Sequence, residues 1–487
     1  MSKFRTVRRD PSRPGARRTR RQGRLLIAGL TSVAGLAGVA SFTGLHLVAA
    51  NQILGDRFSH VAVGKVGNDV GGQGTVGKRG EGDGGQGDVG KGGEGDGGTP
   101  VDCDSNDLIK KLTLANAGSG GVLRLAYQCT YVLTANDGLG NGLPVIFKPI
   151  TIKGNDATIV RAANAAEPAG FRIFNVGNAG DLRLKHLTVK GGKTGNAQGG
   201  GGILVQTGGA LHITDSTVSH NTTTNLAKGG AGIANHGTTT VAHSTLSDNS
   251  TNARGGAIVS TGSLTVEDSQ LTHNNASSGG GLAISSGVAL INKSTVSNNN
   301  TPSGINGGGG IATFGGITTV NHSTISDNTT GIGGGIFSLG GSQFTLRHST
   351  VGRNTSAYGG GGIAIYNFGA LVIEDSAVTA NTTGGNGGGI ASATIFTNNK
   401  NQSIVTLRRS HISLNKAIGP HSIGGGIVTA HGSLSLTGTR VTENSSTIQA
   451  GGVQTNTKAV VDSESAIINN RPTNCLGSTQ PVPNCFG

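Results

Sequence analysis

Apolar and polar positions in residues 200–470 repeat one short pattern ten times. Each repeat opens with a run of glycines and an aliphatic residue. A short alternating segment follows, and then a Ser or Thr anchor with an aliphatic residue two positions later and Asn five positions later. Alternation with a period of two predicts short β-strands that each bury one face. The anchors are Ser216, Ser244, Ser269, Ser294, Ser323, Ser349, Ser376, Ser410, Thr439 and Ser465. The aliphatic residues after them are Val218, Leu246, Leu271, Val296, Ile325, Val351, Val378, Ile412, Val441 and Ile467, and the asparagines are Asn221, Asn249, Asn274, Asn299, Asn328, Asn354, Asn381, Asn415, Asn444 and Asn470.

The anchors are spaced by 25 to 34 residues, which predicts that each repeat is one coil of a solenoid. Three segments of each repeat have the pattern of short strands, and three strands with three turns are typical of the right-handed parallel β-helix. A leucine-rich repeat also pairs aliphatic residues with Asn, but it needs a longer, often helical connection where this chain has glycines. We therefore predict an all-β right-handed parallel β-helix of roughly 12–13 coils over residues 101–470.

Stacked coils place equivalent residues in ladders about 4.8 Å apart. We expect the aliphatic residues of the anchor segments to point inward, together with a second aliphatic column that follows the glycine runs. We expect the asparagines to mark a tight turn, because Asn tolerates the left-handed conformation and its amide can bond to the Asn above and below. The second aliphatic column is Ile203, Ile233, Ile258, Leu282, Ile311, Ile336, Ile363, Ile390, Ile427 and Val453.

Both ends of the predicted array differ from its repeats. Residues 103–117 predict a short amphipathic helix, capped by Asp104 or Ser105 and ended by Gly118, which we expect to cover the open end of the solenoid. Irregular strands should lie between this helix and the array, and a tail at 471–487 follows the last repeat. The expected strands are Val122–Leu125, Tyr131–Thr134, Ile150–Lys153, Thr158–Val160, Phe171–Val176 and Leu182–Val189.

Three segments precede the helix. Residues 1–24 are Arg-rich, and residues 25–50 contain no Lys, Arg, Asp or Glu and end in small residues. This order predicts an export signal cleaved after Ala50, or an uncleaved membrane anchor, because the apolar stretch is long enough to span a bilayer. Residues 51–100 are rich in Gly and in charged residues, so we expect a flexible linker that cannot bury a core.

Amino-acid composition and net charge further limit the functions that the chain can have. Gly contributes 88 of the 487 residues and aromatic residues only 3%, which is unusual for a globular enzyme. The formal charge of +13 suggests nucleic-acid binding, but residues 1–24 hold ten Lys or Arg and one Asp and therefore contribute +9 of it. The remaining +4 is spread over residues 25–487. We therefore predict that the protein does not bind nucleic acid.

The four cysteines lie as two sequence-local pairs that flank the array, Cys103 and Cys129 before it and Cys475 and Cys485 after it. Two disulfides are the simplest expectation for an exported chain, and the sequence leaves their connectivity open. Free buried thiols in a cytosolic protein are the alternative.

The GGGI and GGAI runs, paired with an aliphatic-x-x-Asn box, resemble polymorphic-membrane-protein repeats. The segment before the array, with DCDSNDLIKKLTLANAGSGG and then LPVIFKPITIKG, is similar to that of secreted right-handed β-helix repeat proteins with the pectin-lyase-like fold. The resemblance covers about residues 101–477, and it implies the fold more specifically than a function.

The pectin-lyase-like fold also carries pectate lyases and polygalacturonases, which need clustered carboxylates. In this chain Glu267-Asp268 and Glu374-Asp375 lie four coils apart, and the array contains no Asp-Asp pair. The catalytic residues of those enzymes therefore have no counterpart here. We predict no catalytic, cofactor-binding or metal-ligating residue.

The residue before each anchor belongs to a polar column that we expect to face solvent. Opposite charges are adjacent at Asp268–Lys293 and Asp375–Arg409, which predicts a solvated charge ladder worth about 0–1 kcal/mol per pair. A glycan-facing stripe is the alternative, as is a weak metal site at His322 and His348 without a third ligand. The column is Asp215, His243, Asp268, Lys293, His322, His348, Asp375, Arg409, Gly438 and Glu464.

The longest coil, from Ser376 to Ser410, contains an insertion at 394–403 with the sequence TIFTNNKNQS. Insertions in solenoids often project from the binding face. Our candidate glycan contacts are Phe396 and Lys400 in this insertion and Tyr366 in the coil before it, and ordinary packing is the alternative.

We predict an exported protein, secreted or at the cell surface, that is a non-catalytic scaffold contacting polysaccharide or cell-wall components. Contact with a membrane is expected only through residues 25–50, if these are not cleaved. The alternatives are a polysaccharide lyase or glycoside hydrolase, and a membrane-tethered spacer.

Overall fold

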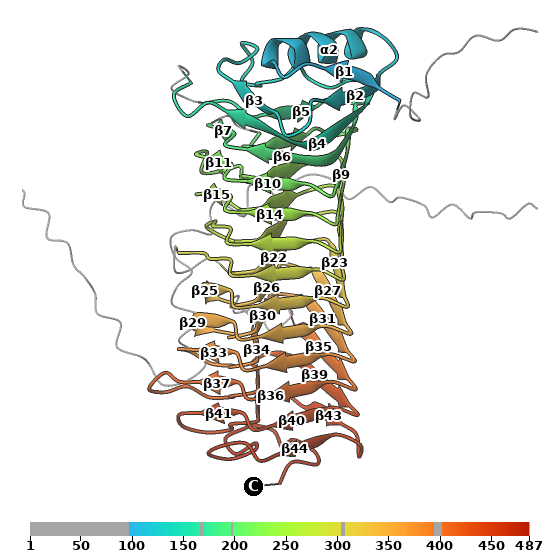
Figure 1. Cartoon of the computed structure of the whole chain (residues 1–487). Helices are drawn as coiled ribbons and strands as arrows, with labels where there is room; N and C mark the ends of the chain where they lie inside the picture. Colours follow the sequence, from blue (N-terminus) through green and yellow to red (C-terminus); the bar gives the residue numbers. More distant parts are fainter. Residues whose placement is uncertain (1–96, 166–169, 196–197, 303–306, 394–401, 487) are drawn as a thin grey trace, which may run out of the picture.

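The computed structural model describes residues 97–165, 170–195, 198–302, 307–393 and 402–486. They form a parallel β-solenoid of about 13 turns, and the helix α2 (Ser105–Ala117) lies across its N-terminal end (Figure 1). The predicted all-β solenoid and its capping helix are confirmed. The predicted basic region at 1–24, the apolar segment at 25–50 and most of the linker at 51–100 lie outside the described residues.

One coil shows how the repeat folds. β16 (Ile258–Ser260) follows the glycines, β17 (Ser263–Glu267) comes next, and β18 (Gln270–Thr272) lies in the anchor segment. A bend at Asp268, with φ 43°, separates β17 from β18. Each strand pairs in parallel with its equivalents in the neighbouring coils, so the backbone hydrogen bonds run along the solenoid axis.

The strands form three kinds of sheet. The glycine sheet follows the glycine runs and contains β5 (Phe174–Val176), β8 (Ile203–Val205), β12 (Ile233–Asn235), β16, β19 (Leu282–Ile284), β22 (Ile311–Phe314), β26 (Ile336–Leu339), β30 (Ile363–Tyr366), β34 (Ile390–Ala393), β38 (Ile427–Thr429) and β42 (Val453–Thr455). The corner sheet has two wings that meet at the bend, and the long strands β4 (Pro149–Arg161) and β6 (Asp181–Lys190) pass through both. Its first wing also contains β1 (Thr99–Val101), β2 (Gly121–Leu125), β9 (Ala210–Thr214), β13 (Thr238–Ala242), β17, β20 (Val288–Asn292), β23 (Ile317–Asn321), β27 (Gln343–Arg347), β31 (Ala370–Glu374), β35 (Ser403–Arg408), β39 (Gly432–Thr437) and β43 (Ala459–Val461). Its second wing also contains β3 (Thr130–Leu133), β10 (Thr217–Ser219), β14 (Thr245–Ser247), β18, β21 (Thr295–Ser297), β24 (Thr324–Ser326), β28 (Thr350–Gly352), β32 (Ala377–Thr379), β36 (His411–Ser413), β40 (Arg440–Thr442) and β44 (Ala466–Ile468). The edge strands follow the asparagines and are β7 (Lys193–Thr194), β11 (Thr222–Thr223), β15 (Ser250–Thr251), β25 (Thr329–Ile332), β29 (Thr355–Gly359), β33 (Thr382–Thr383), β37 (Lys416–Ala417) and β41 (Ser445–Ser446).

The core is a column of aliphatic side chains enclosed by these sheets. The middle residues of the short second-wing strands point inward, and Val296 and Ile325, for example, have 0% exposure. The aliphatic residues after the glycine runs, such as Ile258 and Ile311, are equally buried. Both predicted inward columns are therefore confirmed. Each such side chain contributes roughly 1.5–3 kcal/mol relative to exposure, and neighbouring coils must share that burial because one coil has no partner face.

The asparagine column forms the predicted ladder of amides inside the solenoid. Nδ2 of Asn299 donates to Oδ1 of Asn328, and Nδ2 of Asn328 donates to Oδ1 of Asn354, both at 3.0 Å. The ladder continues in the same way to Asn470, whose Nδ2 donates to Oδ1 of Asn474 in the tail. The predicted bonds between neighbouring amides are confirmed.

The expectation that these asparagines adopt the left-handed conformation is wrong. The residue before each of them adopts it instead, as at Asn298 with φ 56° and Asp327 with φ 58°. The ladder amide must point into the solenoid and reach the next coil, so the positive φ of the turn falls on the solvent-side residue that precedes it. A side chain at that position is free to be Asp, His or Arg because it packs against nothing inside.

Two of the expected strands, 150–153 and 158–160, belong to the single strand β4. The pairing of β4 with β6 shifts between Lys153 and Ala157, where Asn155 and Asp156 have positive φ. This irregular bend replaces the regular anchor bend of the later coils.

Both ends of the solenoid are covered. Asp104 is the N-cap of α2 and accepts a hydrogen bond from the backbone N–H of Asn106 at 3.0 Å, while Leu108 and Leu112 are fully buried against the first coils. At the other end the tail pairs with the last coil through a bridge between Ile467 and Cys485. Across the described residues, no helix is both long and apolar enough to cross a bilayer.

The cysteines form two disulfides, Cys103–Cys129 at the N-terminal end and Cys475–Cys485 at the C-terminal end. Each bond joins the two members of one sequence-local pair, which settles the connectivity that the sequence left open. Disulfides persist in oxidising compartments, so the pair of bonds indicates a location outside the reducing cytosol.

Removing the Cys103–Cys129 disulfide by a double substitution with serine is expected to destabilise the protein by about 2–4 kcal/mol. The bond closes a loop with a sequence separation of 26 residues, against 10 for Cys475–Cys485, so its loss should cost about 1 kcal/mol more than loss of the second bond. Urea denaturation of the two double variants checks the order. A larger loss for the C-terminal pair would contradict the loop-closure argument.

Candidate functional site

The second wing presents two columns of hydroxyl side chains on the outside of the solenoid. In each short strand the middle residue points into the core, so the first and third residues point outward, as Thr295 and Ser297 do on β21. Ser219 and Ser326 are the most covered members, at 6% and 4% exposure. We call this surface the hydroxyl face, and its members are Thr217, Ser219, Thr245, Ser247, Thr272, Thr295, Ser297, Thr324, Ser326, Thr350, Thr379, Ser413 and Thr442.

The hydroxyl face is regular in both directions. From β10 to β40 the pairing between coils has no register shift. Neighbouring coils are about 4.8 Å apart and the two columns about 6.6–6.8 Å apart, because they are separated by two residues of one strand. The Ser and Thr side chains are short and have few rotamers. The surface is therefore flat and would lose little conformational entropy on contact with a ligand. Other residues interrupt the columns at Gln270, Gly352, Ala377, His411 and Arg440.

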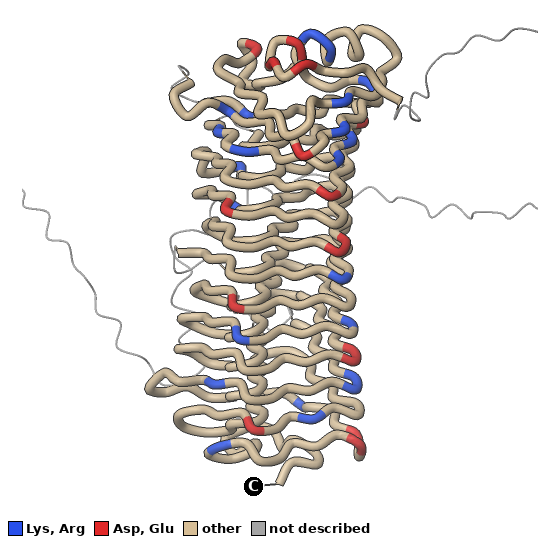
Figure 2. The backbone as a smooth tube through the Cα atoms, in the orientation of Figure 1, with Lys and Arg blue, Asp and Glu red and all other residues tan. Residues whose placement is uncertain are grey.

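Residues with positive φ border the hydroxyl face on both sides. The border before the anchors is the polar column predicted from the sequence, and its members are exposed except Asp375 and Gly438, which are half-buried. Figure 2 shows charged residues of both signs gathered along one edge of the solenoid. From β10 to β32 the hydroxyl face is thus a strip without charged residues beside a charged border.

Charge pairing along this border is selective. The predicted pair Asp375–Arg409 forms, with Nε of the arginine 2.7 Å from Oδ1, and the hydrogen-bonded guanidinium lowers the pKa of Asp375. The predicted pair Asp268–Lys293 does not form within the described residues. The ion pair of an exposed lysine gains little, because its long side chain must be ordered to make it.

Glu374, the carboxylate beside Asp375, lies between two arginines of neighbouring coils. Nε of Arg347 is 2.7 Å and Nη1 of Arg408 is 2.6 Å from its two carboxylate oxygens. Their hydrogen bonds, that of Arg347 first, lower the pKa of Glu374. The carboxylate is therefore held ionised, which suits an ion-pair network and not a general acid.

The two histidines proposed as a weak metal site stack instead. The ring centroids of His322 and His348 are 4.9 Å apart with an interplanar angle of 24°. Rings stacked in this way do not aim their nitrogen lone pairs at one shared ion. In the part of the chain that the structure describes, no group of three or more His, Cys, Asp or Glu could hold a metal ion.

The structure places Tyr366, one of the predicted glycan contacts, inside a packed cluster. Its side chain is 4% exposed and lies edge-on to Phe337 with ring centroids 5.9 Å apart, and burial raises the pKa of Tyr366 to about 12. The ring is therefore not a surface for sugar stacking. Phe396 and Lys400 lie outside the described residues. The cluster covers the outer side of the glycine sheet and contains Ala312, Phe337, Ala364, Tyr366, Ala393 and Ala430.

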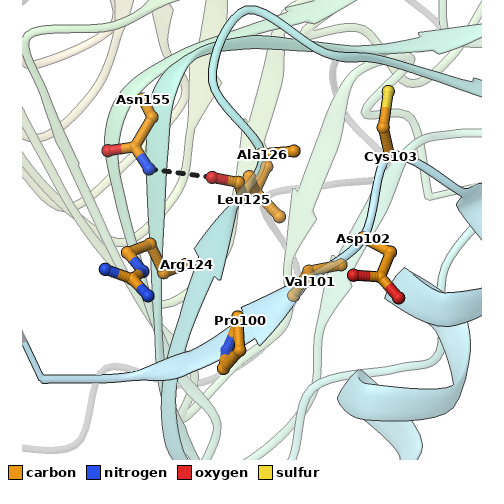
Figure 3. Close-up of a pocket in the computed structure, with 8 residues that line it drawn as sticks. All are labelled: Pro100, Val101, Asp102, Cys103, Arg124, Leu125, Ala126 and Asn155. Carbon is orange, nitrogen blue, oxygen red and sulfur yellow. Dashed lines mark hydrogen bonds between the residues drawn. The ribbon is translucent and has the colours of Figure 1, made fainter.

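A shallow hollow of about 400 Å³ lies at the N-terminal end, between β1, β2 and the bend of β4 (Figure 3). Arg124 and Asp102 lie on opposite sides of it, and Nδ2 of Asn155 donates to the carbonyl oxygen of Leu125 at 2.8 Å. A cation facing a carboxylate, with the amide already engaged, does not form a convergent set of donors for one small ligand.

The hydroxyl face was missed by the sequence analysis, although its signal is present. Ser or Thr follows five of the ten anchors by one position and eight of them by three positions, on either side of the aliphatic residue. Those positions can be identified as outward only once the strand and its inward middle residue are placed, and they vary more than the anchors, which are all Ser or Thr.

Comparisons of the chain with protein-family models, with curated proteins and with solved structures gave no match. The likeness to polymorphic-membrane-protein repeats and to pectin-lyase-like helices therefore rests on the repeat pattern itself. The geometry of the hydroxyl face and its border carries the functional argument.

Proposed function

We propose that this protein is an exported, non-catalytic scaffold that binds polysaccharide along the hydroxyl face. The supporting observation is a pair of unshifted outward columns in which Ser and Thr recur, one from Thr217 to Thr350 and the other from Ser219 to Thr442. A hydroxyl group donates and accepts hydrogen bonds, as do the hydroxyls of a sugar chain. A repeating protein face can therefore meet a repeating polymer with the same contacts in coil after coil.

Such a face gains affinity by repetition. One hydrogen bond contributes only about 0.5–1.5 kcal/mol, so a single coil would bind sugar weakly. Adjacent coils act together because the rigid solenoid holds their hydroxyls in place before the ligand arrives. The length of the array, and not any one residue, then sets the strength of binding.

Export of this scaffold is supported by the two disulfides, which indicate an oxidising compartment. Residues 25–50 would supply the export signal, or an anchor if they are not cleaved. We also infer a right-handed winding, as in the pectin-lyase-like helices, because about 98% of connections between parallel strands of one sheet are right-handed.

The first test is retention of the full-length protein on a panel of neutral and acidic polysaccharides, scored together with the release of new chain ends. Retention without new ends supports the scaffold. New reducing or unsaturated ends would overturn the non-catalytic assignment in favour of a hydrolase or lyase. Absence of retention on every polysaccharide would refute the proposed ligand.

Replacing Thr295, Thr324 and Thr350 together with alanine is expected to weaken retention about tenfold or more. Each substitution removes one outward hydroxyl from adjacent coils of the face, and a hydrogen bond is worth about 0.5–1.5 kcal/mol where 1.4 kcal/mol is tenfold in affinity. Affinity electrophoresis in gels containing the retained polysaccharide measures the change.

The matched control replaces Thr265, Thr319 and Thr345 with alanine. These threonines occupy the outward third position of β17, β23 and β27 in the first wing, beyond the bend. The same chemistry is therefore removed from nearby coils on another face. Equal losses for the two triple variants would show that the hydroxyl face is not the binding surface.

A further inference from the structure

A polar groove lies on the side of the solenoid that carries the edge strands, in the coils from β11 to the one before β25 (Figure 1). Its volume is about 490 Å³, within the range of about 300–1,000 Å³ that is typical of ligand sites. Four consecutive coils line it, with Leu226 at one end along the solenoid axis and Pro302 at the other. Between them lie Ser250, Asn252 and Asn275. We call this hollow the edge groove.

The edge groove follows from the unequal lengths of the connections between each ladder asparagine and the positive-φ glycine of the next glycine run. The long connections, Asn221–Gly230 and Asn299–Gly308, advance nine positions. The two between them, Asn249–Gly255 and Asn274–Gly279, advance only six and five. A coil therefore closes with five or six positions, and the fold does not require the extra residues. Insertions in solenoids often mark the binding face.

The end of the groove at Leu226 is held in shape by its own turn. Oδ1 of Asn225 accepts hydrogen bonds from the backbone N–H of Ala227 at 2.8 Å and from that of Lys228 at 3.0 Å. The hydroxyl of Thr223 donates to the carbonyl oxygen of Lys228 at 3.1 Å. Leu226 is 77% exposed within this turn. A ligand would therefore gain apolar contact with Leu226 without first having to order the turn.

The floor of the edge groove offers polar groups that the fold does not use. In the part of the chain that the structure describes, the side chains of Ser250, Asn252 and Asn275 make no hydrogen bond. Ser277, in contrast, is engaged, because its Oγ donates to the carbonyl oxygen of Ala253 at 2.7 Å. Each uncommitted amide can both donate and accept hydrogen bonds, and so can the hydroxyl of Ser250.

The lining of the edge groove favours a neutral ligand over an ion or a peptide. No Lys, Arg, Asp or Glu is among the described residues that line it, so a charged ligand would meet no opposite charge. The backbone of the floor is already paired, since the N–H of Asn275 donates to the carbonyl oxygen of Asn249 and the N–H of Thr251 to that of Asn275, both at 2.9 Å. An extended peptide therefore has no free strand edge to join.

We propose that the edge groove binds a short neutral oligosaccharide. Sugar hydroxyls would bond to the amides of Asn252 and Asn275, and the apolar C–H face of a sugar ring would contact Leu226. The site is separate from the hydroxyl face, which lies on the second wing, and the inference does not depend on binding there. It would hold the end or a side branch of a glycan, which a flat repeating surface does not enclose.

The test is saturation-transfer NMR of the full-length protein with the neutral disaccharides cellobiose, maltose and lactose and with the acidic digalacturonate. We expect transfer to at least one neutral disaccharide. The variant Asn252→Ala with Asn275→Ala should bind that disaccharide about tenfold more weakly, because two hydrogen-bonding amides are lost. The matched control, Asn178→Ala with Asn300→Ala, removes two exposed amides that do not line the groove and should change the affinity less than twofold.

A further variant separates the edge groove from the hydroxyl face. The triple variant Thr295→Ala, Thr324→Ala and Thr350→Ala should bind the disaccharide as tightly as the original protein does. Losses in this variant equal to those of Asn252→Ala with Asn275→Ala would overturn the edge groove as the site.

The remaining outcomes also decide the inference. Transfer to none of the disaccharides, or equal losses in the two asparagine variants, would refute the edge groove as a sugar site and leave the proposed function standing. Digalacturonate bound as tightly as the neutral disaccharides would overturn the neutral ligand class. Failure to retain any polysaccharide, with disaccharide binding intact, would refute the proposed function and support the edge groove.

Discussion

Replacing Asn328 with alanine is expected to lower the free energy of unfolding by about 3–6 kcal/mol, a large part of the stability of a typical domain. Oδ1 of Asn328 accepts hydrogen bonds from the backbone N–H of Asn299 at 2.9 Å and from its Nδ2 at 3.0 Å. Nδ2 of Asn328 donates to the carbonyl oxygen of Val296 at 2.9 Å and to Oδ1 of Asn354 at 3.0 Å. The residue has 0% exposure, so water cannot replace these partners.

The loss should exceed the sum of ordinary hydrogen bonds because the substitution leaves buried groups without partners. An unsatisfied buried donor or acceptor costs about 1–3 kcal/mol. Alanine at this position leaves the hydrogen-bonding groups of Asn299 and Asn354, in the coils on both sides, without this partner. The matched control is Asn300→Ala, directly after the neighbouring ladder residue Asn299, where the side chain is exposed, and we expect a change within about 0.5 kcal/mol. Urea denaturation followed by circular dichroism measures both variants. A similar midpoint for Asn328→Ala and the original protein would contradict the stabilising role of the ladder.

Replacing Gly308 with alanine is expected to destabilise the protein by about 4 kcal/mol or more. Gly308 has φ +75°, where an L side chain costs about 1–2 kcal/mol. A Cβ at this position would also lie 2.3 Å from the carbonyl oxygen of Ile311, a backbone atom that is fixed by the stacked coils. Gly230, Gly255, Gly279 and Gly333 occupy the same position of their repeats, also with positive φ and a similar close approach.

The control for Gly308 separates backbone strain from collision. Gly341 has φ +76°, almost the same conformation, but a Cβ there would meet nothing within 4 Å. Gly341→Ala should therefore cost only the conformational part, about 1–2 kcal/mol. The difference between the two denaturation midpoints measures the collision alone. Equal effects of the two substitutions would mean that the turn from Gly308 to Ile311 can open to accept a methyl group.

The substitutions Asn328→Ala and Gly308→Ala both test the features that keep the coils regularly stacked. The ladder of amides links each coil to the next through side chains, and the glycine runs let the backbones approach closely enough for that linkage. Because every coil repeats both features, damage in one coil is expected to weaken its neighbours as well. The proposed binding depends on this regularity, since the hydroxyl face exists only while the coils stay in register.

Much of the architecture was readable from the repeat. The aliphatic residues of the anchor segments, such as Val296 and Ile325, recur with a period of two within strands and once per coil, and only a stacked parallel solenoid buries all of them. The capping helix at Ser105–Ala117 could be predicted equally well, because its cap residue, apolar face and terminal glycine are local sequence signals. The amide ladder followed from the strict spacing of the asparagines.

The sequence by itself determined the coil, its inward columns and its closed N-terminal end, because those depend on the spacing of residues within one repeat. Only the tertiary structure decided which turn residue takes the positive φ, that Tyr366 is buried, and that Arg124, Lys153 and Lys185 share one outward column. The first coils do not follow the repeat, so the register of their strands could not be predicted from its spacing. Contacts between coils depend on that register, and register is set by the packing of whole strands and not by the residues of any one segment.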